Sequence, residues 1–266
     1  MTKFKECITI LHVTDSHILA SPTATVLGIN TAHYFQEVIK HAFASHHFDV
    51  ILLTGDLAQD PCMASYQFIK DILEPYNTVC ICLPGNHDDF DLMQQVFSSG
   101  TISCRKHLFL NNWQLIGLNS QIIGAEGGFL SNEELVFLEH CLMNNVNHYA
   151  LIAVHHHCVE TQSSWMDTMI IKNRKQLFAA IKGYPQVKAI AHGHIHQSWE
   201  SNMAGVKIMG TPSTCYQFKP KAKEFSLDDA LPGYRIISLY NNGDIKSEVI
   251  RLTEPLTGLQ MYIHGY

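Results

Sequence analysis

The sequence predicts an α/β fold, and three features of the chain support this class. Near-continuous apolar runs, which suit strands covered on both faces, alternate with segments of helical period through the first two thirds. The last third has the runs and turns that are typical of antiparallel strands. No repeat, charge block or low-complexity linker divides the 266 residues. We therefore expect a single domain over residues 1–266, with mostly antiparallel strands from about residue 205 to 266.

Six apolar runs define the strands of the alternating part. They are ITILHVTD (8–15), VILLTGD (50–56), TVCICLPG (78–85), WQLIGLN (113–119), YALIAVH (149–155) and VKAIAHG (187–193). In the last third, GVKIMGTPS (205–213) and the stretch 233–252 predict further strands. The Asn242-Gly243 pair inside that second stretch predicts a hairpin turn.

Three segments between the strands have helical signals. Apolar residues recur at a 3.6-residue period from 35 to 43. A second helix is expected to begin at Asp60-Pro61, because proline suits the first helical position, and to end before Pro75. Ser131 and Glu134 form a capping-box pattern, which predicts a third helix over 131–143.

The composition is that of an ordinary globular protein, with 46% hydrophobic and 16% charged residues. The net charge of −6 argues against a general binder of nucleic acids or anionic membranes, since phosphate neutralisation needs clustered Lys and Arg. No segment is apolar for long enough to cross a bilayer, and the N-terminus is a poor signal peptide. The eight cysteines form no C-x-x-C pair or dense framework. A cytoplasmic location is therefore expected.

Metal-type ligands follow five of the expected strands. They are Asp15 and His17, Asp56, Asn86 and His87, His155–His157, and His194 and His196. Each motif alone is a weak signal, because Gly-Asp pairs and capped turns are common in ordinary loops. In open α/β sheets, however, ligands bind at the carboxyl ends of the strands. Five such motifs in order therefore predict a site.

The chemistry of these side chains indicates a pair of metal ions. Carboxylates, an amide oxygen and imidazoles without thiolates suit Mn, Fe or Zn. Seven of these side chains, one histidine of 155–157 among them and His87 left out, are too many ligands for one ion that stays open to substrate, but they suit two ions roughly 3.5–4 Å apart that share a carboxylate. Such a site keeps a net positive charge, which favours an anionic phosphodiester, and the neutral Asn86 helps to preserve that charge where an aspartate would not.

The ordered set D-x-H, G-D, G-N-H-D, a mid-chain histidine and G-H-x-H resembles the calcineurin-like metallophosphoesterase family. Two further stretches, 155–174 and 210–239, are similar to the class III cyclic-nucleotide phosphodiesterases, bacterial enzymes that act on 3',5'-cyclic AMP. The resemblance covers nearly the whole chain. It implies a four-layer α/β/β/α sandwich with mixed sheets.

The resemblance also implies a ligand set for each metal ion. One ion would be held by Asp15, His17, Asp56 and His196, and the other by Asp56 as bridge with Asn86, His156 and His194. The choice of His156 rests on a family pattern in which the ligand lies two residues before a proline. Here Cys158 occupies that position, so His155 stays open as the alternative. His192 lies inside the expected strand 187–193 and is interpreted as a packed histidine.

The reaction implied by the resemblance is hydrolysis of 3',5'-cyclic AMP to 5'-AMP by in-line attack of a metal-bound hydroxide. His87 would protonate the leaving oxygen or stabilise charge on the phosphate, and Asn86 and His196 would also contact substrate. Asp88 would orient His87 or cap the following helix. Segments 158–171 and 213–219 would wall the base and ribose, with Tyr216 and Phe218 either stacking on the base or packing in the core.

Two alternatives remain from the sequence: a broader phosphodiesterase for other cyclic nucleotides or small diesters, and a non-catalytic metal-binding regulatory protein. His87 argues against the second, because a binding module needs no proton donor beside its metals. The expected cofactors are two metal ions, Fe or Mn first, with Zn compatible. The expected partner is a cyclic nucleotide, without long nucleic acid or membrane, and the chain is expected to be a monomer or homodimer.

Overall fold

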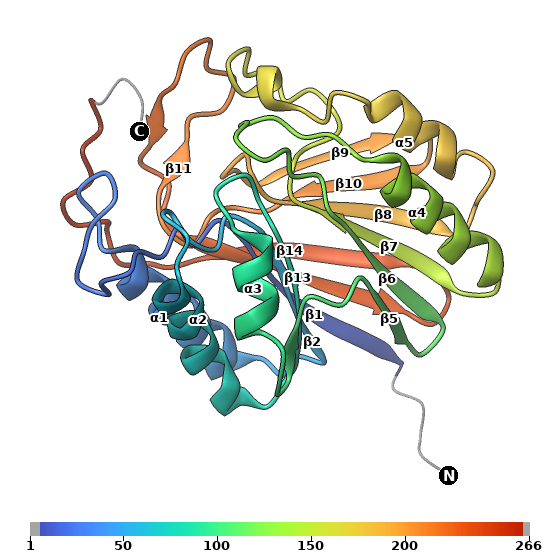
Figure 1. Ribbon diagram of the computed structural model, residues 1–266, viewed down its shortest axis with the longest axis horizontal. Coiled ribbons are helices and arrows are strands. Elements are labelled where there is room, and N and C mark those ends of the chain that lie inside the picture. The colour runs from blue at the N-terminus through green and yellow to red at the C-terminus, as the bar shows by residue number, and fades with distance from the viewer. Residues whose placement is uncertain (1–5, 263–266) are drawn as a thin grey trace.

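The computed structural model describes residues 6–262, and within them two mixed six-stranded sheets pack face to face (Figure 1). The first sheet has the order β14-β13-β1-β2-β3-β4. Its strands, in that order, are Ile245–Arg251, Gly233–Tyr240, Cys7–Val13, Val50–Thr54, Val79–Leu83 and Ile102–Ser103. The second has the order β5-β6-β7-β8-β10-β9. Its strands are His107–Leu110, Trp113–Leu118, Tyr149–Val154, Val187–His192, Val206–Gly210 and Trp199–Met203.

In the part of the chain that the structure describes, five α-helices cover the outer faces of this pair of sheets. They are α1 (Thr31–Ser45), α2 (Met63–Leu73), α3 (Phe90–Val96), α4 (Asn132–Asn144) and α5 (Arg174–Ile181). Figure 1 shows α1, α2 and α3 on one side of the sheets and α4 and α5 on the other. The shorter elements are the 3-10 helices η1 (Glu74–Tyr76) and η2 (Met166–Met169) and the two-stranded ribbon of β11 (Gln217–Phe218) and β12 (Leu227–Asp228).

Alternation along the strands fills the space between these layers. Ile10 and Leu52 point into the core between the sheets, whereas their neighbours Leu11 and Leu53 pack under the helices of the first sheet. A separate cluster, which includes Ile152, lies under α4 and α5. The predicted four-layer α/β/β/α sandwich with mixed sheets is therefore confirmed.

The strands that carry the predicted motifs run parallel within each sheet. β1, β2 and β3 are parallel neighbours in the first sheet, and β6, β7 and β8 in the second. Their carboxyl ends therefore meet at one edge of the sandwich. The last third is mostly antiparallel, with the predicted hairpin joining β13 to β14, but β10 pairs in parallel with β8.

The helix starts agree only in part with the sequence signals. Helix α2 begins at Met63, two residues after the predicted Pro61, because Cys62 is its N-cap. Ser131 does cap α4, accepting a hydrogen bond from the Glu134 amide at 3.3 Å. The Glu134 carboxylate instead pairs with Lys106, at 2.6 Å, so it serves a tertiary contact rather than the reciprocal bond of a capping box.

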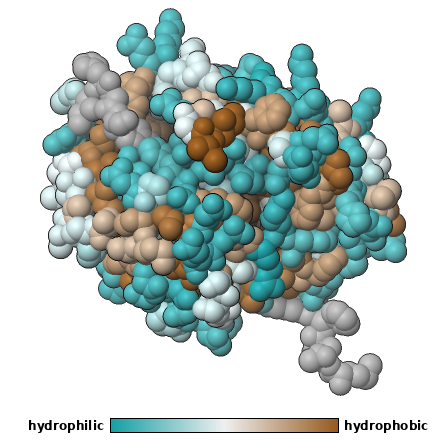
Figure 2. Space-filling view, viewed as in Figure 1, coloured by the Kyte–Doolittle hydropathy of each residue, from teal (hydrophilic) through white to brown (hydrophobic). Residues whose placement is uncertain are grey.

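Among residues 6–262, no helix is long and apolar enough to cross a membrane. Figure 2 shows a largely hydrophilic face on which apolar side chains form small, separate patches.

Candidate metal centre

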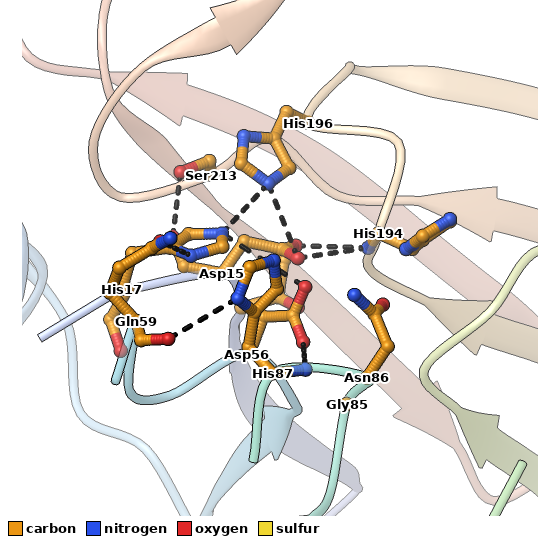
Figure 3. Close-up of polar contacts among 12 residues, drawn as sticks. Asp15, His17, Asp56, Gln59, Gly85, Asn86, His87, His194, His196 and Ser213 are labelled. Carbon is orange, nitrogen blue, oxygen red and sulfur yellow. Dashed lines mark hydrogen bonds and ion pairs between the residues drawn. The ribbon is translucent and has the colours of Figure 1, made fainter. Parts of the chain in front are cut away.

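The predicted motifs all lie at the edge where the parallel strands end, each just beyond its strand. Figure 3 shows the carboxylates of Asp15 and Asp56 at the centre, with His17 and His196 on one side and Asn86 and His194 on the other. All of these side chains are buried except Asn86, which is half-buried. The chain thus places charged and polar groups where the ends of the two sheets converge.

Glycines allow the loops to approach this closely. A Cβ on Gly85 would lie 2.1 Å from Asp56 Oδ1, and one on Gly193 would lie 2.0 Å from Thr14 Oγ1. Both distances are far below van der Waals contact, so neither position has room for a side chain. The glycines of the G-N-H-D and G-H-x-H motifs are therefore required by packing around Asp56 and Asp15.

Backbone strain is concentrated in the same loops. Five of the predicted ligands have positive φ angles: Asp15 (54°), His17 (46°), Asp56 (47°), His194 (67°) and His196 (48°). Residues with a side chain rarely adopt this left-handed region, and such strain clusters at functional sites. Its recurrence at ligand positions indicates that the fold holds these side chains in place for a purpose other than stability.

One group of ligand atoms lies around Asp15. His196 Nε2 is 3.4 Å from Asp15 Oδ1 and 3.2 Å from His17 Nε2. His17 Nε2 lies in turn 4.0 Å from Asp56 Oδ2. The Asp15 carboxylate is held by the His194 backbone amide at 3.0 Å. Asp56 thus borders this group.

A second group lies on the other side of Asp56. His155 Nε2 is 3.3 Å from Asp56 Oδ2, 3.2 Å from Asn86 Oδ1 and 3.2 Å from His194 Nδ1. Asp56 therefore stands between two sets of donors, as a carboxylate shared by two ions would.

His156 is turned toward different partners. Its Nδ1 is 2.8 Å from Ser120 Oγ, and its Nε2 is 3.1 Å from the Glu126 carbonyl oxygen. The rings of His155, His156 and His194 still offer nitrogens within 4.8 Å of one another. Both ring nitrogens of His156 are nevertheless engaged by the loop over 120–126.

Carbonyl oxygens fix the orientation of three imidazoles. His155 Nδ1 donates to the Thr54 carbonyl at 2.7 Å, and His196 Nδ1 donates to the Tyr216 carbonyl at 2.9 Å. His17 Nδ1 donates to the side-chain oxygen of Gln59 at 2.8 Å. In the neutral rings the hydrogen is on Nδ1, so the Nε2 lone pairs converge on the two carboxylates. Such a set of facing acceptors fits cations between them.

The electrostatics keep most of these groups in the forms that bind metals. Burial lowers the pKa of His17 well below its usual value, with His87 adding to the effect. Burial likewise lowers the pKa of His194. Burial acts to raise the pKa of Asp56, but the adjacent His155 outweighs it and holds the pKa well below its usual value. His155 is the exception: Asp56 outweighs burial and raises the pKa of this ring to about 9, so a metal ion bound at its Nε2 would have to displace a proton.

His87 lies beside the two groups and lines a cavity. Its backbone amide donates to Asp56 Oδ1 at 2.9 Å, and its Nδ1 donates to the Gln59 carbonyl at 3.3 Å (Figure 3). The ring is half-buried and meets the His17 ring edge-on, at 5.0 Å between centroids. This position agrees with a group that contacts substrate.

Asp88 does not orient His87. Its carboxylate accepts from the amides of Leu57, Ala58 and Gly85 and from the Tyr66 hydroxyl. It thereby braces the loop after β2 against the loop after β3. Capping of the next helix, α3, falls to Asp89.

The shared Asp56, together with Asn86 and His194 of the second group, lines a cavity of about 560 Å³. Its lining is Asp56, Asn86, His87, Gly124, Ala125, Glu126, Trp165, Met166, Thr168, Met169, His194, Phe218 and Phe225. The volume is in the range of small-molecule sites. Polar ligands therefore form one part of the lining, and aromatic and apolar side chains another.

Sequence reasoning missed several residues of this site. Gln59, which anchors both His17 and His87, lies three residues after Asp56 but belongs to no recognisable motif. Trp165 lies in the predicted wall segment 158–171, but no sequence motif marks it. The signal for it is a large aromatic residue directly after the polar run ETQSS (160–164).

Comparison with known proteins agrees with this arrangement. The calcineurin-like phosphoesterase family matches residues 8–198, a span that includes every predicted ligand. The chain belongs to this family. Together with the relatives described next, this match confirms the predicted class of enzyme, a metal-dependent phosphodiesterase.

Relatives extend the similarity over almost the full length. A protein of Vibrio vulnificus named 3',5'-cyclic adenosine monophosphate phosphodiesterase CpdA is 40% identical over 253 residues, which cover 94% of this chain and 92% of the relative. The protein of the same name from Haemophilus influenzae is 38% identical over 264 residues, covering 98% and 96%.

Solved structures support the fold. A dimetal phosphatase from Danio rerio has a TM-score of 0.60 at 12% identity, covering 92% of this chain and 98% of the other. The purple acid phosphatase PPD1 from yellow lupin has a TM-score of 0.64 at 12% identity, covering 96% and 52%.

Proposed function

We propose that this protein hydrolyses 3',5'-cyclic AMP to 5'-AMP with two metal ions. The observation that carries the proposal is Asp56, which stands between two groups of ligand atoms on the lining of a cavity large enough for a nucleotide. The names of the relatives that match nearly the whole chain support this substrate.

The proposed ligands of the first ion are Asp15, His17, Asp56 and His196. Those of the second are Asp56, Asn86, His155 and His194. We assign His155 in place of His156, because its Nε2 faces Asp56 and Asn86 while both nitrogens of His156 have other partners. Bound there, the two ions would activate a water for attack on phosphorus and offset the charge of the phosphoryl oxygens.

His87 is the proposed general acid for the leaving 3'-oxygen. The Gln59 carbonyl accepts from Nδ1 and so fixes the ring plane beside Asp56. The half-buried position on the cavity lining lets the ring meet substrate. Asn86 and His196 are proposed to contact the phosphate as well as a metal ion, and the neutral Asn86 avoids adding a negative charge beside it.

Turnover of three diesters tests the substrate. We expect the purified holoenzyme to hydrolyse cyclic AMP at a higher kcat/KM than bis(p-nitrophenyl) phosphate, with cyclic GMP as the measure of base preference. Hydrolysis of the aryl diester without hydrolysis of cyclic AMP would instead establish the broader phosphodiesterase. Absence of any turnover by metal-loaded protein would favour the non-catalytic alternative.

The metals are proposed to be Fe or Mn, with Zn compatible with the same oxygen and nitrogen donors. Metal analysis of freshly purified protein, followed by chelation and re-addition of single metals, identifies the active pair. A cytoplasmic location is also part of the proposal, supported by eight cysteines that are all free thiols.

A further inference from the structure

Trp165 is a large aromatic residue on the cavity lining that the proposed reaction does not use. It lies in the connection over 158–171, just before η2, and its side chain is half-buried. It shares the lining with Phe218 and Phe225 and with the ligands Asp56 and Asn86. One cavity thus contains both the candidate metal ligands and an indole ring.

Aromatic contacts place the indole at a fixed position relative to the metal ligands. Phe218 meets the Trp165 ring edge-on at 5.1 Å and 87°, and Phe225 does so at 5.4 Å and 72°. Phe218 in turn stacks on His196 at 4.2 Å and 23°. Trp165 is therefore two ring contacts away from His196, a proposed metal ligand, and it lines the same cavity as Asp56 and Asn86.

The backbone that carries Trp165 is also held in place. Asp167 accepts from the Thr161 amide at 2.8 Å and from its hydroxyl at 2.9 Å, and lies 3.4 Å from His157 Nε2. The Thr168 hydroxyl donates to the Trp165 carbonyl at 2.6 Å. The contact with His157 ties the connection over 158–171 to the loop directly after β7, which also carries the proposed ligand His155. Such preorganisation lowers the cost of ordering a binding surface.

The indole N–H of Trp165 lacks the hydrogen bond that the core tryptophan of this protein makes. Trp113, fully buried between the sheets, donates its Nε1 hydrogen to the Tyr240 carbonyl at 2.9 Å. The Nε1 of Trp165 is buried without a hydrogen-bond partner within residues 6–262. Leaving a buried donor unpaired costs free energy, so packing alone gives a poor account of tryptophan at this position.

We propose that Trp165 stacks on the nucleobase of the cyclic nucleotide; the inference rests on the proposed function. The phosphate is held by the ligand groups, and the base lies along the aromatic part of the lining. Gly124 and Ala125, also on the lining, take up little side-chain volume and leave room for a planar ring. Because every base has a π-face, this contact supplies affinity without distinguishing adenine from guanine.

Three cyclic phosphates test the proposal with Trp165→Ala. Base–aromatic stacking predicts that KM rises roughly 5- to 150-fold for cyclic AMP and by a similar factor for cyclic GMP. The third substrate, ribose 3',5'-cyclic phosphate without a base, should keep its KM, and kcat should change little for all three. Trp165→Phe should give an intermediate KM. Phe109→Ala, at an exposed ring on β5 outside the cavity lining, is the matched control.

Each contrary result has one meaning when metal content and circular dichroism match the wild type. An unchanged KM for both cyclic nucleotides overturns the stacking role. A KM that rises equally for the base-free substrate makes Trp165 a structural wall, which also overturns it. Absence of cyclic-nucleotide turnover by the wild-type enzyme refutes the proposed function itself. If Trp165→Ala does not fold, the same comparison is made with Trp165→Phe and Trp165→Leu.

Discussion

His87 is the residue whose role separates an enzyme from a metal-binding module. We expect His87→Ala to lower kcat for cyclic AMP roughly 10²- to 10⁴-fold, because a positioned general acid contributes about that much. Metal content should stay at two ions, since the proposed ligand sets do not include this ring. Metal analysis and steady-state kinetics on the same sample check both, with exposed His33→Ala as control. Loss of a metal together with activity would make His87 a ligand.

The neighbouring histidines His155 and His156 are distinguished by metal content. His155→Ala should retain about one ion, because its Nε2 contacts Asp56, Asn86 and His194. His156→Ala should retain two but raise KM, because it loses the bonds that hold the loop over 120–126. The opposite pattern of metal loss would assign His156 as the ligand.

At the scale of single residues, the ends of the expected strands predict where the ligands lie. They do not decide between His155 and His156. Strand alternation applies only while the backbone is extended, and β7 ends at Val154, before the three histidines. Asp88 was open for another reason. Its amide partners Leu57 and Ala58 lie about thirty residues earlier, and no local pattern reports such a contact.

At the scale of elements, η2 and its connection carry the aromatic part of the cavity lining. Asp167→Ala removes the acceptor that fixes Thr161 and pairs with His157. We expect KM for cyclic AMP to rise roughly tenfold, the size of one lost hydrogen bond, while kcat changes little. Kinetics combined with limited proteolysis of 158–171 checks this. The exposed Asp229→Ala should leave both unchanged, and a fall in kcat alone in Asp167→Ala would contradict a role in binding.

The elements found from sequence are those with a buried, continuous apolar run. β1, β2, β3, β6, β7 and β8 all have one, and each was predicted within a few residues. β9, Trp199–Met203, is an edge strand of mixed exposure with no apolar run, and it was missed. Helix α5 was missed because the five apolar residues of its short sequence, RKQLFAAI, form one consecutive run and so define no helical period.

At the scale of the whole molecule, the packing of the sheets was inferred from the family resemblance rather than from hydropathy. Apolar runs indicate strands buried on both faces but do not say which strands share a sheet. That information is held by pairs distant in sequence, such as β1 with β13. The resemblance supplied it, and the two six-stranded sheets agree with it.

A buried histidine between the sheets links their packing to pH. His12 is fully buried, with Thr54 Oγ1 and Thr211 Oγ1 each 2.7 Å from one of its ring nitrogens. Burial lowers its pKa well below 6.5, and Arg235 and His192 lower it further. The unfolded chain therefore binds a proton below about pH 6.5 that the folded protein does not, so stability falls as pH drops below that value.

His12→Gln removes this proton linkage while keeping a polar group. The variant should be less stable than wild type at pH 7.5, and the difference should shrink by about 1 kcal/mol when pH falls from 6.5 to 5.5. Denaturant unfolding at several pH values measures it, with exposed His140→Gln as the control. A difference that stays constant with pH would show that His12 takes up a proton in the folded state.

Metal removal should affect the stability of the entire sandwich, because the proposed ligands come from loops of both sheets. Asp15 and Asp56 belong to the first sheet, and His155, His194 and His196 to the second. Without cations, the folded state has to hold two buried carboxylates and several facing Nε2 atoms close together, with no bound positive charge between them. An ion that binds only the folded state adds about 2.7 kcal/mol at a hundred times its Kd, and two ions would add about twice that.

For a chain of this size, that loss corresponds to a fall in Tm of roughly 10 °C or more on chelation. Thermal unfolding with and without EDTA, followed by re-addition of Mn²⁺, measures the fall and its reversal. Asp56→Asn weakens the shared ligand of both ions, so its Tm should respond much less to EDTA. An equal response in the variant and the wild type would mean that the chelated ions lie outside the centre around Asp56, and the shared-carboxylate arrangement would have to be abandoned.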